Sequence, residues 1–452
     1  MNNKDQIKFA SLALGCKTNQ YEMDALNNEA AAAGFQLVPA DDAADVYVLN
    51  SCTVTAEAGR KCRQMLRRFR KQNPEALIVC SGCHSELYDL GPLCDLSIGT
   101  VGRSKLLAAI ISKLTEAESP DRASLQQERF LVESGNPLWK QYEELPGTAY
   151  AEETRAYLKI QDGCDNRCSY CATTLARGPA RSRQPEAILR EAGELVAAKY
   201  GELVLTGTNL NSYACDWQRI DPEAPGLIEL LEDLSRIPGL IRLRLSSIDA
   251  AGIISDEFME RYARIERACP HFHLSLQSGS DRILRAMRRR DTRESFRGAV
   301  ETIRKYLPAA GISTDIIVGF PGETEEDFRD TMDFCEEMDF MRIHVFRFSR
   351  REDTPAYDMP DQVHGDVKRE RAEKMHTLAE KLARRAIDRS LGETRKVLAE
   401  RDDESGRWHG YTEDYLPAVV LPDTSRVISR GDLLKVRLCE GCDSFVIARV
   451  SD

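Results

Sequence analysis

The feature that most constrains this chain is a loop near its middle with three cysteines, Cys164, Cys168 and Cys171. The loop directly follows an apolar stretch, Tyr157–Ile160, that predicts a strand, and Gly163 lets the backbone turn between the two. Most iron–sulfur clusters take four cysteines. Three thiolates in one loop therefore predict a [4Fe–4S] cluster with one iron open to a further ligand. A structural zinc site or three unrelated core cysteines are weaker interpretations, because zinc usually has a fourth ligand.

A second set of cysteines is expected at one edge of an N-terminal sheet. Three apolar runs end at Cys16, Cys52 and Cys83, and the helical stretches Tyr21–Ala33 and Thr55–Lys71 separate them. Alternating strands and helices predict a parallel sheet, in which ligands bind outside the carboxyl ends of the strands. We therefore expect the three thiols to meet and to hold a second cluster. The alternative is that they are ordinary buried cysteines.

The length of 452 residues predicts several domains. We expect an N-terminal parallel-sheet α/β domain over residues 1–140, followed by strand–helix units that predict a partial (β/α)6 barrel over residues 141–390. A polar linker is expected within residues 112–150. Short alternating runs over residues 391–452 predict a small antiparallel β-barrel. The strands predicted for the larger barrel are Tyr157–Gln161, Glu202–Thr206, Ile241–Ser246, Phe272–Gln277, Ser313–Val318 and Arg342–Phe348. Those predicted for the small barrel are Arg395–Ala399, Trp408–Thr412, Ala418–Leu421, Leu433–Leu438 and Phe445–Val450.

Composition limits the compartment and the partners. The sequence has no apolar stretch long enough to span a bilayer and no secretory signal at its N-terminus, so we expect a cytoplasmic protein without a membrane partner. Fourteen cysteines in a reducing compartment indicate metal or redox chemistry rather than disulfides. The net charge of −11 argues against a protein that binds nucleic acid over its whole surface. A basic face on the Thr55–Lys71 helix is either a local phosphate site or simply solvated.

The Cys164–Cys171 loop resembles the signature of the radical SAM enzymes, and the whole chain resembles the methylthiotransferases of that superfamily. Those enzymes have an N-terminal cluster domain, a radical SAM barrel and a C-terminal, RNA-binding TRAM domain, in the order expected here. The resemblance implies two [4Fe–4S] clusters, with S-adenosylmethionine on the open iron of the barrel cluster and Tyr170 near its adenine. At the ends of the barrel strands, we expect further contacts to S-adenosylmethionine from Gly207, Ser246, Gln277 and Gly319.

An arginine-rich stretch after the cysteine loop matches another motif of the family. We expect Arg177, Arg181 and Arg183 to contact a substrate phosphate or carboxylate bidentately, or instead to form salt bridges that close the mouth of the barrel. Two later segments, Leu276–Asp281 and Asp315–Thr324, also match barrel motifs of the family. The histidines in or beside the barrel strands receive no role, since lone histidines at such places are more often core or surface residues. They are His271, His273 and His344.

The opening motif, Leu14–Glu22, together with Asn50–Thr55, resembles the enzymes that act on N6-threonylcarbamoyladenosine in tRNA. The implied reaction is methylthiolation of C2 of that adenosine, just 3′ of the anticodon. S-adenosylmethionine would be both methyl donor and radical source, and a flavodoxin- or ferredoxin-like protein the electron donor. The sequence identifies no sulfur donor. Two departures from the family, Ala172-Thr173-Thr174 after one ligand and His84 after another, bear on substrate choice.

Three other functions compete with this one. The substrate could be tRNA carrying isopentenyladenosine, or an aspartate of a ribosomal protein, whose enzymes usually have other residues in the opening motif. A third reading, from another functional class, is a non-enzymatic iron–sulfur electron carrier. Such a carrier usually has four cysteines per cluster and needs no open iron.

Overall fold

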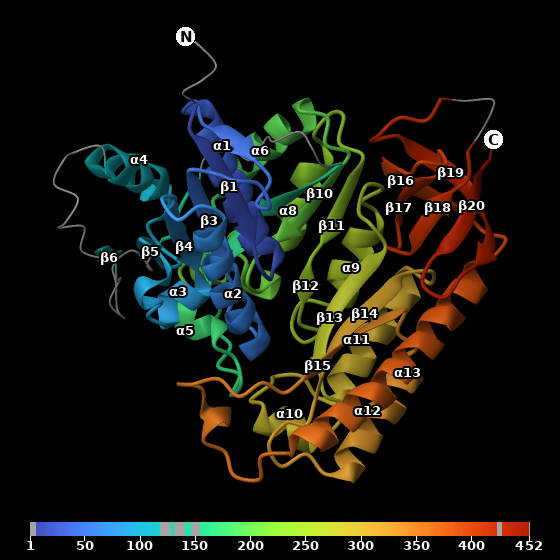
Figure 1. Cartoon of the computed structure of the whole chain (residues 1–452). Helices are drawn as coiled ribbons and strands as arrows, with labels where there is room; N and C mark the ends of the chain where they lie inside the picture. Colours follow the sequence, from blue (N-terminus) through green and yellow to red (C-terminus); the bar gives the residue numbers. More distant parts are fainter. Residues whose placement is uncertain (1–5, 118–127, 131–140, 146–153, 423–426, 452) are drawn as a thin grey trace.

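The computed structural model describes residues 6–117, 128–130, 141–145, 154–422 and 427–451. Three bodies follow one another along the chain (Figure 1): an N-terminal sheet with helices around it, an open barrel, and a small C-terminal barrel. The predicted fold class is confirmed. Among the described residues, no helix is both long and apolar enough to cross a membrane.

The N-terminal sheet is parallel throughout and has the strand order β2-β1-β3-β4-β5-β6. Its central strand β3 is buried along its whole length, because helices cover both faces of the sheet. Alternate residues of β3 accordingly pack into two cores, Val46 and Val48 on one face and Tyr47 and Leu49 on the other. The strands are β1 Lys8–Ala13, β2 Gln36–Val38, β3 Val46–Ser51, β4 Leu77–Gly82, β5 Leu96–Ile98 and β6 Glu128–Phe130. The helices are α1 Lys17–Ala32, α2 Ala56–Gln72, α3 Cys83–Leu87 and α4 Leu106–Ala117.

The expected linker over residues 112–150 needs a correction. Helix α4 continues to Ala117, and β6 adds a sixth strand to the N-terminal sheet by pairing with β5. A strand of three residues is too short to show an alternating pattern, and its partner in the sheet is distant in sequence. Residues 118–127, 131–140 and 146–153, which make up most of the rest of that segment, lie outside the described residues.

The barrel contains all six predicted strands, every neighbouring pair of them parallel. They form two sheets, in the orders β11-β10-β7 and β12-β13-β14-β15. The extra strand β12 follows β11 after a one-residue break at Ser246, and this break carries the chain from one sheet to the next. The strands are β7 Arg155–Lys159, β10 Glu202–Thr206, β11 Arg242–Leu245, β12 Ser247–Ile248, β13 His271–Gln277, β14 Gly311–Val318 and β15 Arg342–Arg347.

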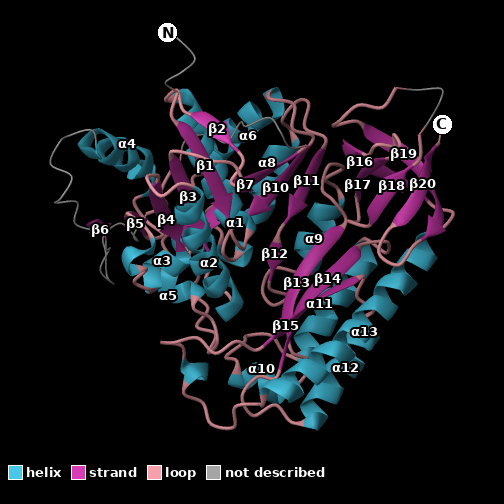
Figure 2. Cartoon of the chain, in the orientation of Figure 1, coloured by secondary structure: helices cyan, strands magenta, loops and turns pink. Residues whose placement is uncertain are grey.

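Helices cover the outside of this barrel (Figure 2). They are α6 Pro185–Ala197, α8 Leu227–Ser235, α9 Asp256–Ala263, α10 Asp281–Ala286, α11 Arg293–Tyr306, α12 Glu325–Met338 and the long α13 Gly365–Ser390. Two further short helices, α5 Thr173–Arg177 and α7 Cys215–Gln218, and a short antiparallel pair, β8 Gln161–Asp162 with β9 Arg181–Ser182, follow the first and second barrel strands. Helix α13 packs along β15 and leads into the C-terminal barrel.

The C-terminal barrel closes in the order β16-β17-β18-β20-β19. Its strands are β16 Thr394–Asp402, β17 Trp408–Thr412, β18 Pro417–Val420, β19 Leu433–Gly441 and β20 Val446–Val450. The prediction of a small barrel is confirmed, but one part of it was wrong: β18 and β20 pair in parallel, not antiparallel. Alternation along a strand reports which face is buried and carries no information on the direction of its neighbour.

Candidate active site

The predicted cysteine loop lies after the carboxyl end of the first barrel strand, between β8 and helix α5. The turn into the loop requires glycine: Gly163 has φ +72°, and a Cβ there would lie 1.9 Å from the carbonyl oxygen of Pro179. The backbone N–H of Cys164 then donates to the Gly178 carbonyl, which closes the base of the loop. Burial raises the pKa of the Cys164 thiol to about 11. Such thiols become thiolates when a metal replaces the proton, which suits an iron–sulfur cluster.

The three thiols of this loop line a cavity of about 300 Å³. The rest of the wall comes from strand ends of the barrel and from Val54 and Thr55 at the start of α2, so the cavity lies between the barrel and the N-terminal domain. Residues from five barrel strand ends or the loops after them line it: Thr208, Asn209, Ser247, Ile248, Asp249, Ser275, Gln277, Asp315, Ile317, Phe346, Arg347, Phe348 and Ser349. This is the position in which barrel enzymes place their substrates.

Two of the five residues expected to contact S-adenosylmethionine, Tyr170 and Gln277, line this cavity. The other three, Gly207, Ser246 and Gly319, are not among its described lining residues, although each follows or ends a barrel strand. At Gly207 a side chain would come within 2.8 Å of the Gln161 side-chain oxygen, so glycine allows the two strand ends to approach. Their contact with the cofactor stays a prediction.

A polar frame around the cysteine loop was not anticipated from the sequence. The Asp249 carboxylate accepts hydrogen bonds from Asn166 at 2.9 Å, Asn209 at 3.2 Å and Arg289 at 2.6 Å. Asn209 and Asp249 each follow a predicted strand, so their position was a usable signal. No sequence signal marked Asn166 or Arg289. Asn166 lies in the cysteine loop and Arg289 in the segment after α10, and only the folded barrel brings the two together. The frame fixes the loop that carries the thiols.

The N-terminal cysteines also meet, as the sheet topology predicted. Cys16 precedes α1, Cys52 follows β3, and Cys83 is the first residue of α3. Gly15 has φ +95°, and a Cβ there would lie 2.5 Å from the sulfur of Cys52, so the first two loops touch. Burial and the neighbouring Cys83 thiol together raise the pKa of Cys52 to about 12, with Cys16 contributing further. Three converging thiols at one sheet edge suit a second cluster.

The three arginines of the arginine-rich stretch are buried between the N-terminal domain and the barrel. The guanidinium of Arg177 donates to Glu22, Asp162, Asn19 and the sulfur of Cys83, at 2.8 to 3.3 Å. Arg181 donates to backbone carbonyls, and Arg183 pairs with Glu144 and Glu191. This arrangement is the one expected of salt bridges at the mouth of the barrel.

Glu22 is the centre of this network. Its carboxylate is fully buried and pairs with Arg103, Lys159 and Arg177, which come from both domains. Burial alone would raise the pKa of Glu22, but these three cations hold it well below the ordinary value. The network therefore locks α1, and with it Cys16, against the first barrel strand.

Replacing Arg177 by methionine should destabilise the chain strongly. The substitution leaves Glu22 and Asp162 buried with fewer cations, and breaking a buried pair in this way typically costs about 3–5 kcal/mol. The measurement is urea unfolding of the cluster-free protein. Arg67→Met, at an exposed position of α2, is the matched control and should change stability by less than about 0.5 kcal/mol. An unchanged midpoint for Arg177→Met would leave this arginine available for a substrate role.

Two family models match the chain. The radical SAM superfamily matches residues 158–335, and the uncharacterized protein family UPF0004 matches residues 8–91. The chain is 37% identical to the threonylcarbamoyladenosine tRNA methylthiotransferase MtaB of Bacillus subtilis, over 94% of this chain and 92% of that protein. The MtaB of Thermotoga maritima is also 37% identical, over 89% of this chain and 88% of its own. A tRNA-2-methylthio-N(6)-dimethylallyladenosine synthase of Pelotomaculum thermopropionicum is 33% identical, over 88% of each chain.

Among solved structures, the chain resembles the radical S-adenosylmethionine methyltransferase TsrM of Kitasatospora setae, with a TM-score of 0.53 and 16% identity. The match covers 78% of this chain and 77% of that one. At this identity the likeness concerns the fold alone.

Proposed function

Because the chain belongs to the radical SAM methylthiotransferases, we propose that it transfers a methylthio group to C2 of N6-threonylcarbamoyladenosine in tRNA. It is a transferase that uses S-adenosylmethionine and [4Fe–4S] clusters. The observation that carries the proposal is the presence of two thiol triplets on domains that pack together: one lines a barrel cavity, and the other lies at the sheet edge that is held to the barrel through Arg177. An electron carrier would need no such pairing.

The two thiol sets have different tasks in this proposal. When bound, the barrel cluster supplies the reducing electron that turns S-adenosylmethionine into a radical source, which is needed because the C2–H bond of a purine is not acidic. Cys164, Cys168 and Cys171 hold that cluster, while Tyr170 and Gln277 position its ligand. Cys16, Cys52 and Cys83 would hold the second cluster, which would supply the sulfur for the transfer.

The opening motif supports the threonylcarbamoyl substrate indirectly. Asn19 and Glu22 of this motif lie in the buried network around Arg177, so they set the position of Cys16.

Since all three arginines of the arginine-rich stretch already have buried partners, we assign substrate phosphates to another surface. Helix α2 begins beside the cavity, where the backbone N–H of Ala56 donates to Ser349. Its exposed basic residues extend away from that mouth and fit a tRNA backbone: Lys61, Arg63, Arg67, Arg68 and Lys71.

The substrate assignment predicts that the enzyme distinguishes two forms of the same tRNA. The holoenzyme should methylthiolate tRNA that carries threonylcarbamoyladenosine, and its rate on the same transcript without that group should fall at least about 100-fold, because a site built for polar groups rejects an analogue that lacks them. Nucleoside mass spectrometry of both reactions measures this ratio. A tRNA with isopentenyladenosine is the control. Equal rates on all three would refute the substrate and leave the chemistry intact.

We propose a flavodoxin- or ferredoxin-like electron donor and a cytoplasmic location, where tRNA is modified. A second cavity, of about 270 Å³, is lined by Cys168 and by Arg219, Arg288 and Arg290. All three arginines are exposed. An acidic small redox protein that docks there would approach the cluster closely and would be guided by charge. None of the residues that the structure describes identifies the sulfur donor.

A further inference from the structure

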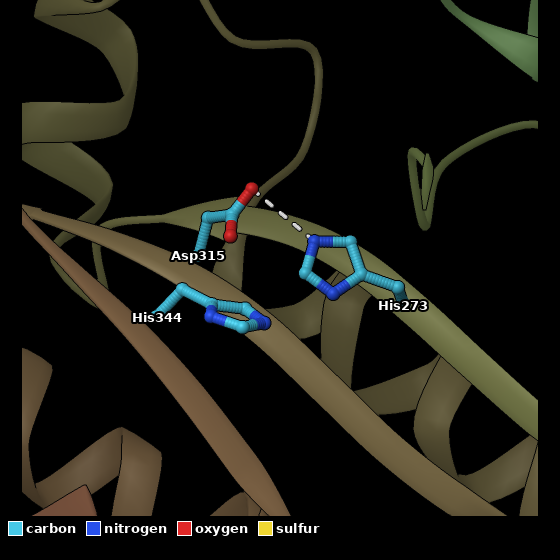
Figure 3. A group of neighbouring side chains, drawn as sticks. All are labelled: His273, Asp315 and His344. Carbon is cyan, nitrogen blue, oxygen red and sulfur yellow. Dashed lines mark ion pairs between the residues drawn. The ribbon is translucent and has the colours of Figure 1, made fainter. Parts of the chain in front are cut away.

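Three side chains on neighbouring barrel strands converge at a place that the proposed reaction does not use. They are His273 on β13, Asp315 on β14 and His344 on β15, and one possible ligand atom from each lies within 4.8 Å of the others (Figure 3). Strand pairing brings them together: Asp315 lies directly opposite His344, and His273 lies opposite Ser313, two residues before Asp315. Because the register of a parallel sheet is fixed, this grouping is part of the fold.

The group faces the interior of the barrel. Residues two apart on a strand share a face. Ser275, Ile317 and Phe346, each two residues after a member of the group, line the main cavity, and so does Asp315 itself. The two histidines and the aspartate therefore form the next layer below that cavity, and the space above them is the space in which the substrate would bind.

The distances suit a metal ion. Metal bonds of about 2.0–2.2 Å place two ligands of one tetrahedral zinc ion about 3.3–3.5 Å apart. The Nε2 atom of His273 and a carboxylate oxygen of Asp315 are 3.2 Å apart. His344 is exposed and forms no hydrogen bond to any described residue, so a rotation of its side chain completes the set. Figure 3 shows the ring of His344 beside the side chains of His273 and Asp315.

The other ring nitrogen of His273 has the partner that a metal ligand needs. Its Nδ1 lies 3.0 Å from the Ser313 hydroxyl, which leaves Nε2 directed at Asp315. Histidine ligands almost always use their second nitrogen for such a bond, which fixes the tautomer and the ring orientation. Ser313 is held in turn by His271, 3.1 Å away on the next layer.

We infer that His273, Asp315 and His344 bind one divalent transition-metal ion, such as Zn²⁺, at the floor of the barrel cavity. Two imidazoles and one carboxylate are typical ligands of such ions, and three protein ligands leave positions open toward the cavity for water or an oxygen anion. Two cations, Arg342 and Lys17, lower the pKa of His344 by their charge and would likewise oppose a positive ion. Their repulsion should make binding weaker than in a site with the same ligands and no neighbouring cations.

Zinc content of the reconstituted holoprotein tests this inference without any assay of activity. The protein, with both clusters in place, is incubated with Zn²⁺, desalted, and analysed for zinc, iron and sulfide. Wild type should keep one zinc more per chain than His344→Ala, and Asp315→Asn should match His344→Ala. His376→Ala, which removes an exposed histidine from α13, should bind like wild type. Unchanged iron and sulfide in every sample exclude exchange at the cluster cysteines.

Titration calorimetry supplies a second, directional test. Ser313→Ala should weaken zinc binding about 10–100-fold, because it removes the bond that orients His273. Arg342→Ala should strengthen it severalfold, since it removes a repelling charge. The inference is overturned if wild type holds no zinc beyond that of His344→Ala, or if Arg342→Ala weakens binding. The first result would identify the group as a hydrogen-bonded His–Asp pair, and the second would mean that the zinc is bound elsewhere, whatever the tRNA substrate proves to be.

Discussion

A variant with Cys16, Cys52 and Cys83 all replaced by alanine should still cleave S-adenosylmethionine to 5′-deoxyadenosine but should form no methylthio nucleoside. The barrel thiols and the cavity that they line are untouched in this variant, so the radical chemistry is retained. The sulfur-bearing cluster is lost, because its three ligands come from the edge of the N-terminal sheet. We expect methylthiolation to fall by at least about 10⁴-fold, as when a residue essential to the chemistry is removed. One cluster per chain should remain by iron and sulfide analysis.

The same domain offers a matched control with equal loss of thiols. Cys62, Cys80 and Cys94 are buried in its core, and the sulfurs of Cys62 and Cys80 lie 3.9 Å apart. Their replacement by alanine should lower stability through cavities and leave both clusters in place. Methylthiolation by the Cys16/Cys52/Cys83 variant, or two clusters in it, would mean that the sulfur is presented elsewhere.

Cys168→Ala should abolish formation of 5′-deoxyadenosine and, with it, all product. A cluster held by only three thiolates has no spare ligand, so losing one leaves it labile. Cys168 also lies beside Arg289, which belongs to the frame around the loop. The expected loss exceeds about 10³-fold in the rate of S-adenosylmethionine cleavage under strong reductant.

Cys215→Ala is the comparison for this variant. It removes a half-buried cysteine that lines the neighbouring cavity without belonging to the loop. This control should keep both clusters and normal cleavage. Undiminished cleavage by Cys168→Ala would contradict the assignment of the radical site, even if the N-terminal assignment were correct.

Much of the fold could be predicted because its strands are buried and regular. The cysteine-terminated strands β3 and β4 of the first sheet contain continuous apolar runs, as two-sided burial produces. Barrel strands such as β11 and β13 instead alternate apolar with polar residues, which is an equally regular strand signal. The features that could not be predicted depend on contacts with distant strands and not on the local pattern of apolar residues. The three residues of β6, the break at Ser246 and the parallel pairing of β18 with β20 are all settled by neighbours distant in sequence.

In the site, too, some residues could be predicted from a sequence pattern and others only from their neighbours in the fold. The thiols could be placed because each follows a strand or lies in a spaced loop. Arg177 could not be assigned from its motif, since the same residue type serves a phosphate or a buried carboxylate, and only the position of Glu22 distinguishes the two. His273 and His344 lie 71 positions apart in the sequence and look like isolated residues there. Only the strand register brings both of them to Asp315.

The charge network around Glu22 also limits how such enzymes can be recombined. Its anion comes from α1, while Lys159 and Arg177 come from the barrel. In a chimera that joins this N-terminal domain to the barrel of a relative, Glu22 would be buried against a barrel surface that evolved with a different N-terminal domain. The two halves must therefore be inherited together, so substrate range in this architecture cannot be exchanged as a cassette at the domain boundary. To transfer the substrate range to another enzyme, Glu22 of the N-terminal domain and the cations that face it from the barrel must be transferred together.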